Sequence, residues 1–134
     1  MKIKCISKLS LREEADALIL PYFRGSKGVA SVAFQEKSLS KWGKDSISLG
    51  DFEGNLGEIF LVHPKGIKEK RVILLGLGAQ SEISTESLRR TYAKAVQYCH
   101  QHKIKKVNLM FPKLKLAYEQ AIQGTCEGVF LSNY

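Results

Sequence analysis

The sequence of 134 residues lacks the features that mark membrane-spanning, secreted and disulfide-stabilised proteins. No apolar run approaches the roughly 20 residues that a transmembrane helix needs. The N-terminal segment interleaves lysines with apolar residues, unlike a signal peptide. The three cysteines, Cys5, Cys99 and Cys126, are far apart and form no C-x-x-C pair. We therefore expect a soluble cytoplasmic protein with buried, reduced thiols and no membrane partner.

Recognisable catalytic and metal-binding motifs are also missing. There is no H-E-x-x-H, no G-x-S-x-G and no Walker motif. His100 and His102 lie two residues apart near a predicted helix end, so they point in different directions, and His63 stands alone before a proline. Two pairs of acids occur. Glu13 with Glu14 is interpreted as a solvated turn, and Asp51 with Glu53 flanks a predicted hairpin turn, where the two acids could share a face. The sequence therefore predicts no catalytic, cofactor-binding or metal-ligating residue in this chain.

Acidic residues are scarce in the second half of the chain. The formal net charge is +8, and residues 65–134 contribute +7 of it, from twelve Lys or Arg and five Asp or Glu. No acid lies between Ser87 and Tyr118. That stretch carries Arg89, Arg90, Lys94, Lys103, Lys105, Lys106, Lys113 and Lys115.

Two interpretations of this basic stretch remain open. Lysines on the solvent face of a helix commonly serve solubility, and no aromatic residue alternates with them to stack on bases. Clustered positive charge can also bind the phosphates of a nucleic acid. The stretch from Arg89 to Lys115 is therefore either a solvated surface or a site for an anionic partner.

The first half of the chain is predicted to contain mainly strands. Residues 2–7 alternate in polarity and residues 16–21 form a buried run. The segment LREEA between them is too short for a crossover helix joining parallel strands. The remaining predictions are a glycine-containing loop at 22–28, a ragged helix at 29–42, and a β-hairpin from Ile47 to His63 that turns at Gly54-Asn55.

The stretch RVILLGLG, residues 71–78, predicts a central strand covered on both faces. It ends in Gly76-Leu77-Gly78, the start of a dinucleotide-binding motif, but Ser81 replaces the third glycine. The next helix begins near Ser84, too late for its N-terminus to contact a pyrophosphate held by the two glycines. We therefore expect these glycines to form a structural turn.

A helix and a strand follow. Ser84 is a good N-cap and Glu86 lies in the first helical turn. One face of this helix, which should end near His102, carries Leu88, Tyr92, Ala95, Val96 and Cys99. Residues 106–111 predict a strand, which makes a right-handed β-α-β crossover the default.

The last predicted helix covers residues 115–131, with an apolar stripe at Tyr118, Ile122, Cys126 and Val129. Gly124 and Gly128 lie on one face of this helix, where they would allow a neighbouring element to approach closely. The sequence stops directly after the apolar segment GVFLSNY, as if at a domain boundary.

The order and spacing of four blocks resemble the N-terminal domain of the leucine aminopeptidase (cytosol aminopeptidase) family. The blocks are GDFEGNLGEIFLVHP, RVILLGLG, LRRTYAKAVQYCHQHKIKKVNLMFP and EGVFLSNY. The resemblance implies an α/β fold with a mixed sheet between helices, a three-layer architecture similar to macro domains. It also implies that residues 1–134 are one non-catalytic domain.

The resemblance further implies a larger catalytic domain beyond residue 134, carrying two divalent metal ions, Zn or Mn, and the catalytic residues. The expected partners are that catalytic domain and other copies in a homohexamer, where the N-terminal domain shapes access to the active sites. Some bacterial members of the family also bind DNA.

Three hypotheses about function follow. The first is a non-catalytic assembly domain of a metal-dependent leucyl aminopeptidase that removes N-terminal amino acids from peptides. The alternative is a nucleic-acid-binding module that uses the Arg89–Lys115 stretch. The third is an ADP-ribose pocket, supported by the fold analogy and the Gly76–Gly78 turn alone.

Overall fold

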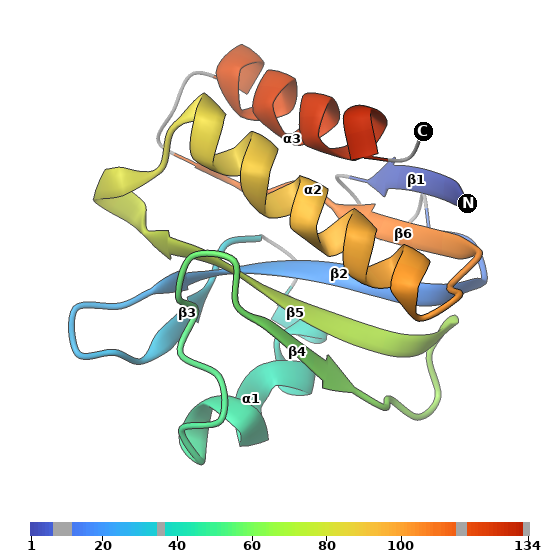
Figure 1. Cartoon of the computed structure of the whole chain (residues 1–134). Coiled ribbons are helices and arrows are strands. Elements are labelled where there is room, and N and C mark those ends of the chain that lie inside the picture. Colours follow the sequence, from blue (N-terminus) through green and yellow to red (C-terminus); the bar gives the residue numbers. More distant parts are fainter. Residues whose placement is uncertain (7–11, 35–36, 115–117, 133–134) are drawn as a thin grey trace.

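The computed structural model describes residues 1–6, 12–34, 37–114 and 118–132. A six-stranded mixed sheet separates helices α2 and α3 on one face from helix α1 on the other (Figure 1). This arrangement confirms the predicted three-layer α/β fold. In chain order the elements are β1 (Lys2–Ile6), β2 (Ala15–Arg24), β3 (Ala30–Val32), η2 (Lys37–Leu39), α1 (Lys41–Ser48), β4 (Ile59–Val62), β5 (Glu69–Ala79), η3 (Gln80–Glu82), α2 (Thr85–Gln101), β6 (Lys106–Met110) and α3 (Tyr118–Ser132).

The strands lie in the order β1-β6-β2-β5-β4, and β3 pairs with the end of β2. β2 runs parallel to both of its long neighbours, β5 and β6, and β1 runs parallel to β6. β4 is antiparallel to β5, and β3 is antiparallel to β2. β1 and β2 therefore run in the same direction, with β6 inserted between them, although only residues 7–14 connect them.

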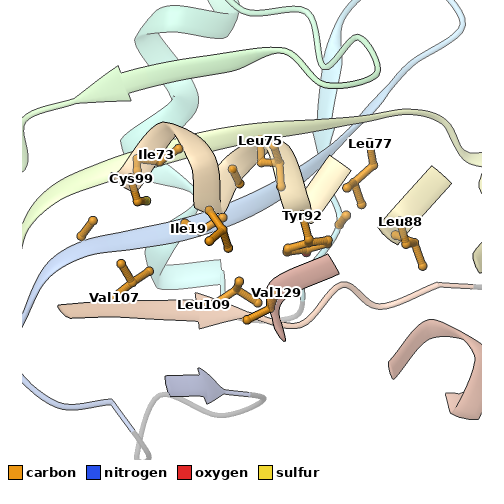
Figure 2. Close-up of a cluster of buried hydrophobic side chains, with 14 of the residues drawn as sticks. Ile19, Ile73, Leu75, Leu77, Leu88, Tyr92, Cys99, Val107, Leu109 and Val129 are labelled. Atoms are coloured by element: carbon orange, nitrogen blue, oxygen red, sulfur yellow. The ribbon is translucent and has the colours of Figure 1, made fainter. Parts of the chain in front are cut away.

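The two central strands, β2 and β5, are buried on both faces, as the apolar run predicted. Alternate side chains face α2 and α3, where Ile19, Ile73 and Leu75 are fully buried (Figure 2). The residues between them face α1, and Leu18 and Leu74 are fully buried there. The core therefore consists of two apolar layers with the sheet between them.

Helix α2 agrees closely with its prediction. The Ser84 side chain accepts a hydrogen bond from the backbone N–H of Ser87, 3.1 Å away, and the Ser87 hydroxyl accepts one from the Ser84 N–H at 2.9 Å. This reciprocal pair is a capping box that satisfies two unpaired donors of the first turn. The C-cap is His102. The whole predicted apolar face is buried: Leu88, Tyr92, Ala95, Val96 and Cys99.

Helix α3 packs on α2 through its glycines. A Cβ placed on Gly124 would lie 2.6 Å from the carbonyl oxygen of Thr85, and one on Gly128 would lie 2.3 Å from that of Arg89. Both distances are shorter than a real contact, so only glycine permits this approach. The predicted role of the two glycines is confirmed.

The predicted apolar stripe of α3 is rotated by about one residue. Of the predicted positions, Val129 is buried as expected, whereas Ile122 and Cys126 are only partly buried. The other buried positions among the described residues of α3 are Ala121, Gly124, Thr125 and Gly128. The side chain of Tyr118 and the predicted helical residues 115–117 lie outside the described part of the chain. The glycines, rather than the larger apolar residues, determine which side of the helix faces inward.

The predicted loop at 22–28 and helix at 29–42 are largely wrong. β2 continues to Arg24, and Ala30–Val32 returns beside it as β3. The Gly25 N–H donates to the Val29 carbonyl at 2.9 Å and closes the turn between the two strands. Helix α1 begins only at Lys41. The spacing of Val29, Val32 and Ala33 resembles a helix, but pairing with β2 decides the conformation.

The predicted hairpin from Ile47 to His63 is wrong in its first strand. Ile47 belongs to α1, and the helix ends at Ser48 before Gly50, whose φ is +77°. The return strand is confirmed as β4, but its antiparallel partner is β5. Apolar residues at 47 and 49 match a strand, whereas buried Gly43 and Ser46 form the inner face of a short helix.

The thiols differ in burial. Cys99 is fully buried, whereas Cys5 and Cys126 are partly buried, and all three are free. Burial raises the pKa of Cys99 to about 12. Burial, with a further contribution from Cys126, raises the pKa of Cys5 to about 11, and burial also raises the pKa of Cys126. The expectation of buried thiols holds fully for Cys99 and partly for the other two.

Gly124→Ala and Gly128→Ala should each lower the free energy of unfolding by about 1–3 kcal/mol, because the added methyl group overlaps a backbone carbonyl of α2. In an exposed helix the same change would raise stability by about 1 kcal/mol. Urea denaturation measures the sign directly. Gln120→Ala, at an exposed position of α3, is the matched control and should stay within about 0.5 kcal/mol. A stabilising effect at either glycine would contradict the observed packing.

A thiol-specific reagent such as DTNB should react with the cysteines at about pH 8 in the order Cys126, Cys5, Cys99. Only the thiolate attacks, and a pKa of about 12 leaves roughly one Cys99 in ten thousand ionised at that pH. Denaturing urea should make all three react at similar rates, which provides the control. Fast labelling of Cys99 in the folded protein, located by peptide mass spectrometry, would contradict its burial.

Candidate functional site at the carboxyl ends of β2 and β5

The topology creates a crevice where β2 and β5 end. After β2 the chain returns through β3 to α1 on one face, whereas after β5 it passes through η3 to α2 on the other face (Figure 1). Neighbouring parallel strands whose connections leave toward opposite faces form a topological switch point. Ligands of open α/β sheets bind in the crevice at that point. The β2–β5 junction is therefore the position at which this topology favours a ligand.

A pocket of about 390 Å³ lies at this junction. Its described lining contains one basic residue and several hydroxyl and amide groups, and no acid. The lining residues are Phe23, Arg24, Gly25, Ser26, Ser31, Ala79, Gln80 and Ser81. We call this set the switch-point pocket.

Arg24 is the charged group of the switch-point pocket. Its Nη1 donates to the side-chain oxygen of Asn55, and its Nη2 lies 3.9 Å from the Glu53 carboxylate, at the outer limit of an ion pair. The Arg24 side chain is still 47% exposed. The guanidinium is therefore oriented by its neighbours while part of its surface remains open to the pocket.

The loop from Gly54 to Glu58, here the GNLGE loop, covers the end of β5. The Gly76 N–H donates to the Glu58 carbonyl at 2.8 Å, and the Gly78 N–H donates to the Gly54 carbonyl at 3.0 Å. A Cβ on Gly76 would lie 2.0 Å from the Asn55 carbonyl oxygen. The glycines of β5 thus admit another backbone.

This contact corrects the prediction that Gly76 and Gly78 form a turn. β5 continues through both residues to Ala79, and the ladder with β2 shifts register between Tyr22 and Arg24. Gly78 has a φ of +81° at this bulge. Because the GNLGE loop already occupies both glycine N–H groups, they do not form a cradle for a pyrophosphate. Gly54 has the predicted positive φ, +81°, whereas Asn55 does not.

The acidic pairs noted in the sequence have structural contacts. Glu13 lies 2.9 Å from the Lys4 ammonium and 3.4 Å from that of Lys106, and these lysines, Lys4 first, lower the pKa of Glu13. Glu14 and Asp51 are exposed, and Glu53 lies beside Arg24. Glu13 and Glu53 therefore face basic side chains, and the absence of a catalytic role for these acids stays a prediction.

A buried polar cluster at the amino ends of the strands was not found from the sequence. The Glu69 carboxylate lies 2.9 Å from the Arg12 guanidinium and accepts a hydrogen bond from the Asn108 amide at 2.8 Å. Asn108 also donates to the Glu13 carbonyl at 2.6 Å. Glu69 and Asn108 are 3% and 0% exposed, and these contacts offset part of the cost of burying them, although Glu69 Oε1 and Asn108 Oδ1 have no hydrogen-bond partner among the described residues. A single polar residue within an apolar strand gives no periodic signal.

Asp16 makes further hydrogen bonds at the same end of the sheet. Its carboxylate accepts hydrogen bonds from the backbone N–H groups of Lys105 and Lys106, both at 3.1 Å. Burial opposes its ionisation, but these two bonds and the nearby cations lower the pKa of Asp16 overall. The carboxylate therefore fixes the start of β6 against β2.

The basic stretch is distributed over several elements. Arg89 and Arg90 on α2 both contact the Glu86 carboxylate, at 3.0 and 2.9 Å. Lys106 begins β6 and contacts Glu13, and Lys115 lies outside the described residues. Part of the charge is thus neutralised locally, and nucleic-acid binding by this stretch stays a prediction.

The described residues contain no group of three or more His, Cys, Asp or Glu side chains that could hold a metal ion. His102 lies against the Tyr98 ring, with 4.2 Å between ring centres.

Across the same described ranges, no helix combines the length and apolarity required to cross a membrane.

Comparison with known proteins identifies the family. Residues 19–134 match the family model described as cytosol aminopeptidase family, N-terminal domain. The chain is 38% identical to a probable cytosol aminopeptidase of Protochlamydia amoebophila over 126 residues, which is 92% of this chain and 25% of that protein. It is 33% identical to the probable cytosol aminopeptidase of Chlamydia caviae, covering 93% of this chain and 26% of that protein. The chain therefore spans about a quarter of the length of these relatives.

Solved structures agree on the fold. A mutant of tomato leucine aminopeptidase superposes with a TM-score of 0.63 at 16% identity, covering 100% of this chain and 28% of that one. The macrodomain of Mycobacterium tuberculosis DarG superposes with a TM-score of 0.65 at 14% identity, covering 96% of this chain and 90% of that one. The predicted macro-domain-like architecture is confirmed. The sequence matches show that the chain belongs to the cytosol aminopeptidase family, within which it corresponds to the N-terminal domain.

Proposed function

We propose that this chain is the non-catalytic N-terminal domain of a cytoplasmic, metal-dependent leucyl aminopeptidase. The observation that carries the proposal is the coverage: over nine-tenths of the chain matches relatives named probable cytosol aminopeptidase, but only about a quarter of their length, and the matching family model describes an N-terminal domain. The peptidase chemistry, with its two divalent metal ions, would then belong to the remaining three quarters. Removal of N-terminal amino acids from peptides is the activity of that parent enzyme.

The arrangement of polar residues supports a scaffolding role. The buried Glu69 and the partly buried Asp16 hold strands together through Arg12, Asn108 and backbone amides. Such groups are committed to structure, and their partners leave little freedom for proton transfer. The two apolar layers around the sheet give the domain a core of its own, suited to presenting a surface to other domains or subunits.

The domain's role in the parent would be to support oligomer assembly, with a hexamer as the expected state, and to shape access to the active sites. Of the five large apolar side chains exposed among the described residues, the three most exposed lie on separate elements: Leu49 after α1, Leu56 in the GNLGE loop and Phe130 on α3, at 75%, 61% and 66%. Exposed apolar residues are common on monomers. In an assembly domain they are the first candidates for contacts with neighbours.

This chain and a full-length relative should differ in peptidase activity. The 134-residue chain should show no metal-dependent hydrolysis of leucyl-p-nitroanilide with Mn²⁺ or Zn²⁺. The full-length Protochlamydia amoebophila relative, assayed in parallel, is the positive control. Turnover by the chain alone that a chelator abolishes would overturn the proposal.

A chimera tests the assembly role. We expect a version of the Protochlamydia amoebophila relative whose matching segment is replaced by this chain to assemble and hydrolyse the substrate, because the two segments share 38% identity. A version lacking the segment should form smaller oligomers, as measured by light scattering. Phe130→Asp in the chimera should weaken assembly more than Gln120→Asp, since both positions are exposed but only Phe130 is apolar. Unchanged assembly without the segment would contradict the assigned role.

A further inference from the structure

We propose that the switch-point pocket binds the phosphate group of a small molecule, held by Arg24 and by hydroxyl groups from β3 and from η3 after β5. The inference is independent of the aminopeptidase assignment, because it depends only on the geometry of this domain. It assigns a binding role to residues that neither the core nor the buried polar cluster uses.

The position of the switch-point pocket in the sheet favours a ligand. The pocket lies at the carboxyl ends of neighbouring parallel strands, β2 and β5, whose connections leave toward opposite faces of the sheet. A β-bulge lies at the same point, between the pairs Tyr22–Gly76 and Arg24–Ala79. Bulges next to functional sites re-aim side chains, and this one sets the direction in which the chain leaves β5 toward Gln80 and Ser81.

The hydrogen-bond donors that line the pocket suit a phosphate group. The described lining offers donors from Arg24, from the hydroxyls of Ser26, Ser31 and Ser81, and from the amide of Gln80, without any carboxylate. An arginine fork with several hydroxyls suits a phosphate, whose three terminal oxygens accept from several directions. A carboxylate has only two acceptor oxygens and would leave part of this set unused.

The contacts of Arg24 leave its positive charge available to a ligand. Its Nη1 is engaged by a neutral amide, that of Asn55, and the Glu53 carboxylate is 3.9 Å from Nη2. Neither contact fully neutralises the guanidinium, which is half-exposed at the pocket. A phosphate would therefore add a strong charge-assisted pair without breaking a closed salt bridge.

The volume of the pocket and the neighbouring GNLGE loop limit the size of the ligand and the number of phosphates that it can carry. A volume of about 390 Å³ is at the low end for small-molecule sites. The N–H groups of Gly76 and Gly78 are already bonded to the GNLGE loop, so a second phosphate cannot use them. The pocket thus fits one phosphate, either free or esterified to a small group such as a sugar.

The test is an NMR titration of the ¹⁵N-labelled chain in chloride buffer with inorganic phosphate, ribose 5-phosphate and acetate. Phosphate should shift the amide signals of residues 24–26, 31 and 79–81 saturably, and acetate should bind at least about tenfold more weakly. Tighter binding of ribose 5-phosphate than of phosphate identifies an ester as the ligand, and equal binding identifies free phosphate. Acetate binding as tightly as phosphate would overturn the assignment.

Variants locate the site. Arg24→Gln should raise the dissociation constant at least about tenfold. Glu53→Gln should lower it, because it removes the carboxylate that competes for Arg24, and a purely structural role of Glu53 would not produce this gain. Lys27→Gln changes an exposed cation in the same β2–β3 turn, outside the described lining, and should alter the constant less than twofold.

A double variant covers the case in which Arg24→Gln loosens the GNLGE loop. Ser31→Ala with Ser81→Ala changes exposed side chains and should weaken binding while leaving the remaining spectrum intact. An equal loss of affinity for Lys27→Gln and Arg24→Gln, or shifts spread over all the surface lysines, would show non-specific charge attraction and overturn the proposal. So would an absence of saturable shifts.

Discussion

The parallel pairing of β2 with β5 is the constraint on which the rest of this domain depends. Both strands are long, ten and eleven residues, and nearly every side chain along them is buried. A strand buried on both faces must be paired on both edges and covered above and below, because unsatisfied backbone groups are costly there. β6 pairs with the remaining edge of β2 and β4 with the remaining edge of β5, and α2 and α1 cover the two faces. The three layers follow from this requirement.

Where two covering segments must cross closely, the domain uses glycine and brings backbone against backbone. Gly124 and Gly128 bring α3 onto the carbonyl groups of α2, and Gly54 and Gly76 bring the GNLGE loop onto β2 and β5. A side chain at any of these positions would separate the elements. At the strand ends this packing also has a chemical consequence. It uses the glycine N–H groups of β5 internally, so that recognition at the crevice falls to side chains.

Signals confined to one segment made part of the fold predictable. The capping serine Ser84 and the 3.6-residue period placed α2 correctly, and the apolar run after Arg71 placed β5. Segments whose pattern fits two structures were assigned wrongly. The residues after Gly28 have helical spacing, but Ala30–Val32 become a strand because β2 extends past its apolar run and offers a free edge. Ile47 and Leu49 alternate like a strand, yet α1 includes the first of them.

The candidate site was harder to predict for a related reason. Arg24, Ser31 and Gln80 lie on three elements, separated by up to 56 positions, and only the parallel pairing of β2 with β5 brings them together. The sequence drew attention to Gly76 and Gly78, which lie beside the site but bind the domain's own loop. Histidine and acid patterns gave no reason to expect a metal site, and the described residues contain no group of three or more His, Cys, Asp or Glu that could hold a metal ion.

The two ends of the sheet differ in how they use polar groups. At the amino ends, Asp16 and Glu69 meet cations, an amide and backbone donors, so their charges are satisfied within the fold. At the carboxyl ends, the lining of the crevice offers donors without a carboxylate among its described members. Neutralised charge stabilises a scaffold, whereas a donor set without an internal acceptor remains available to a ligand. The fold thus separates the polar groups that hold the strands together from those that can recognise an anion.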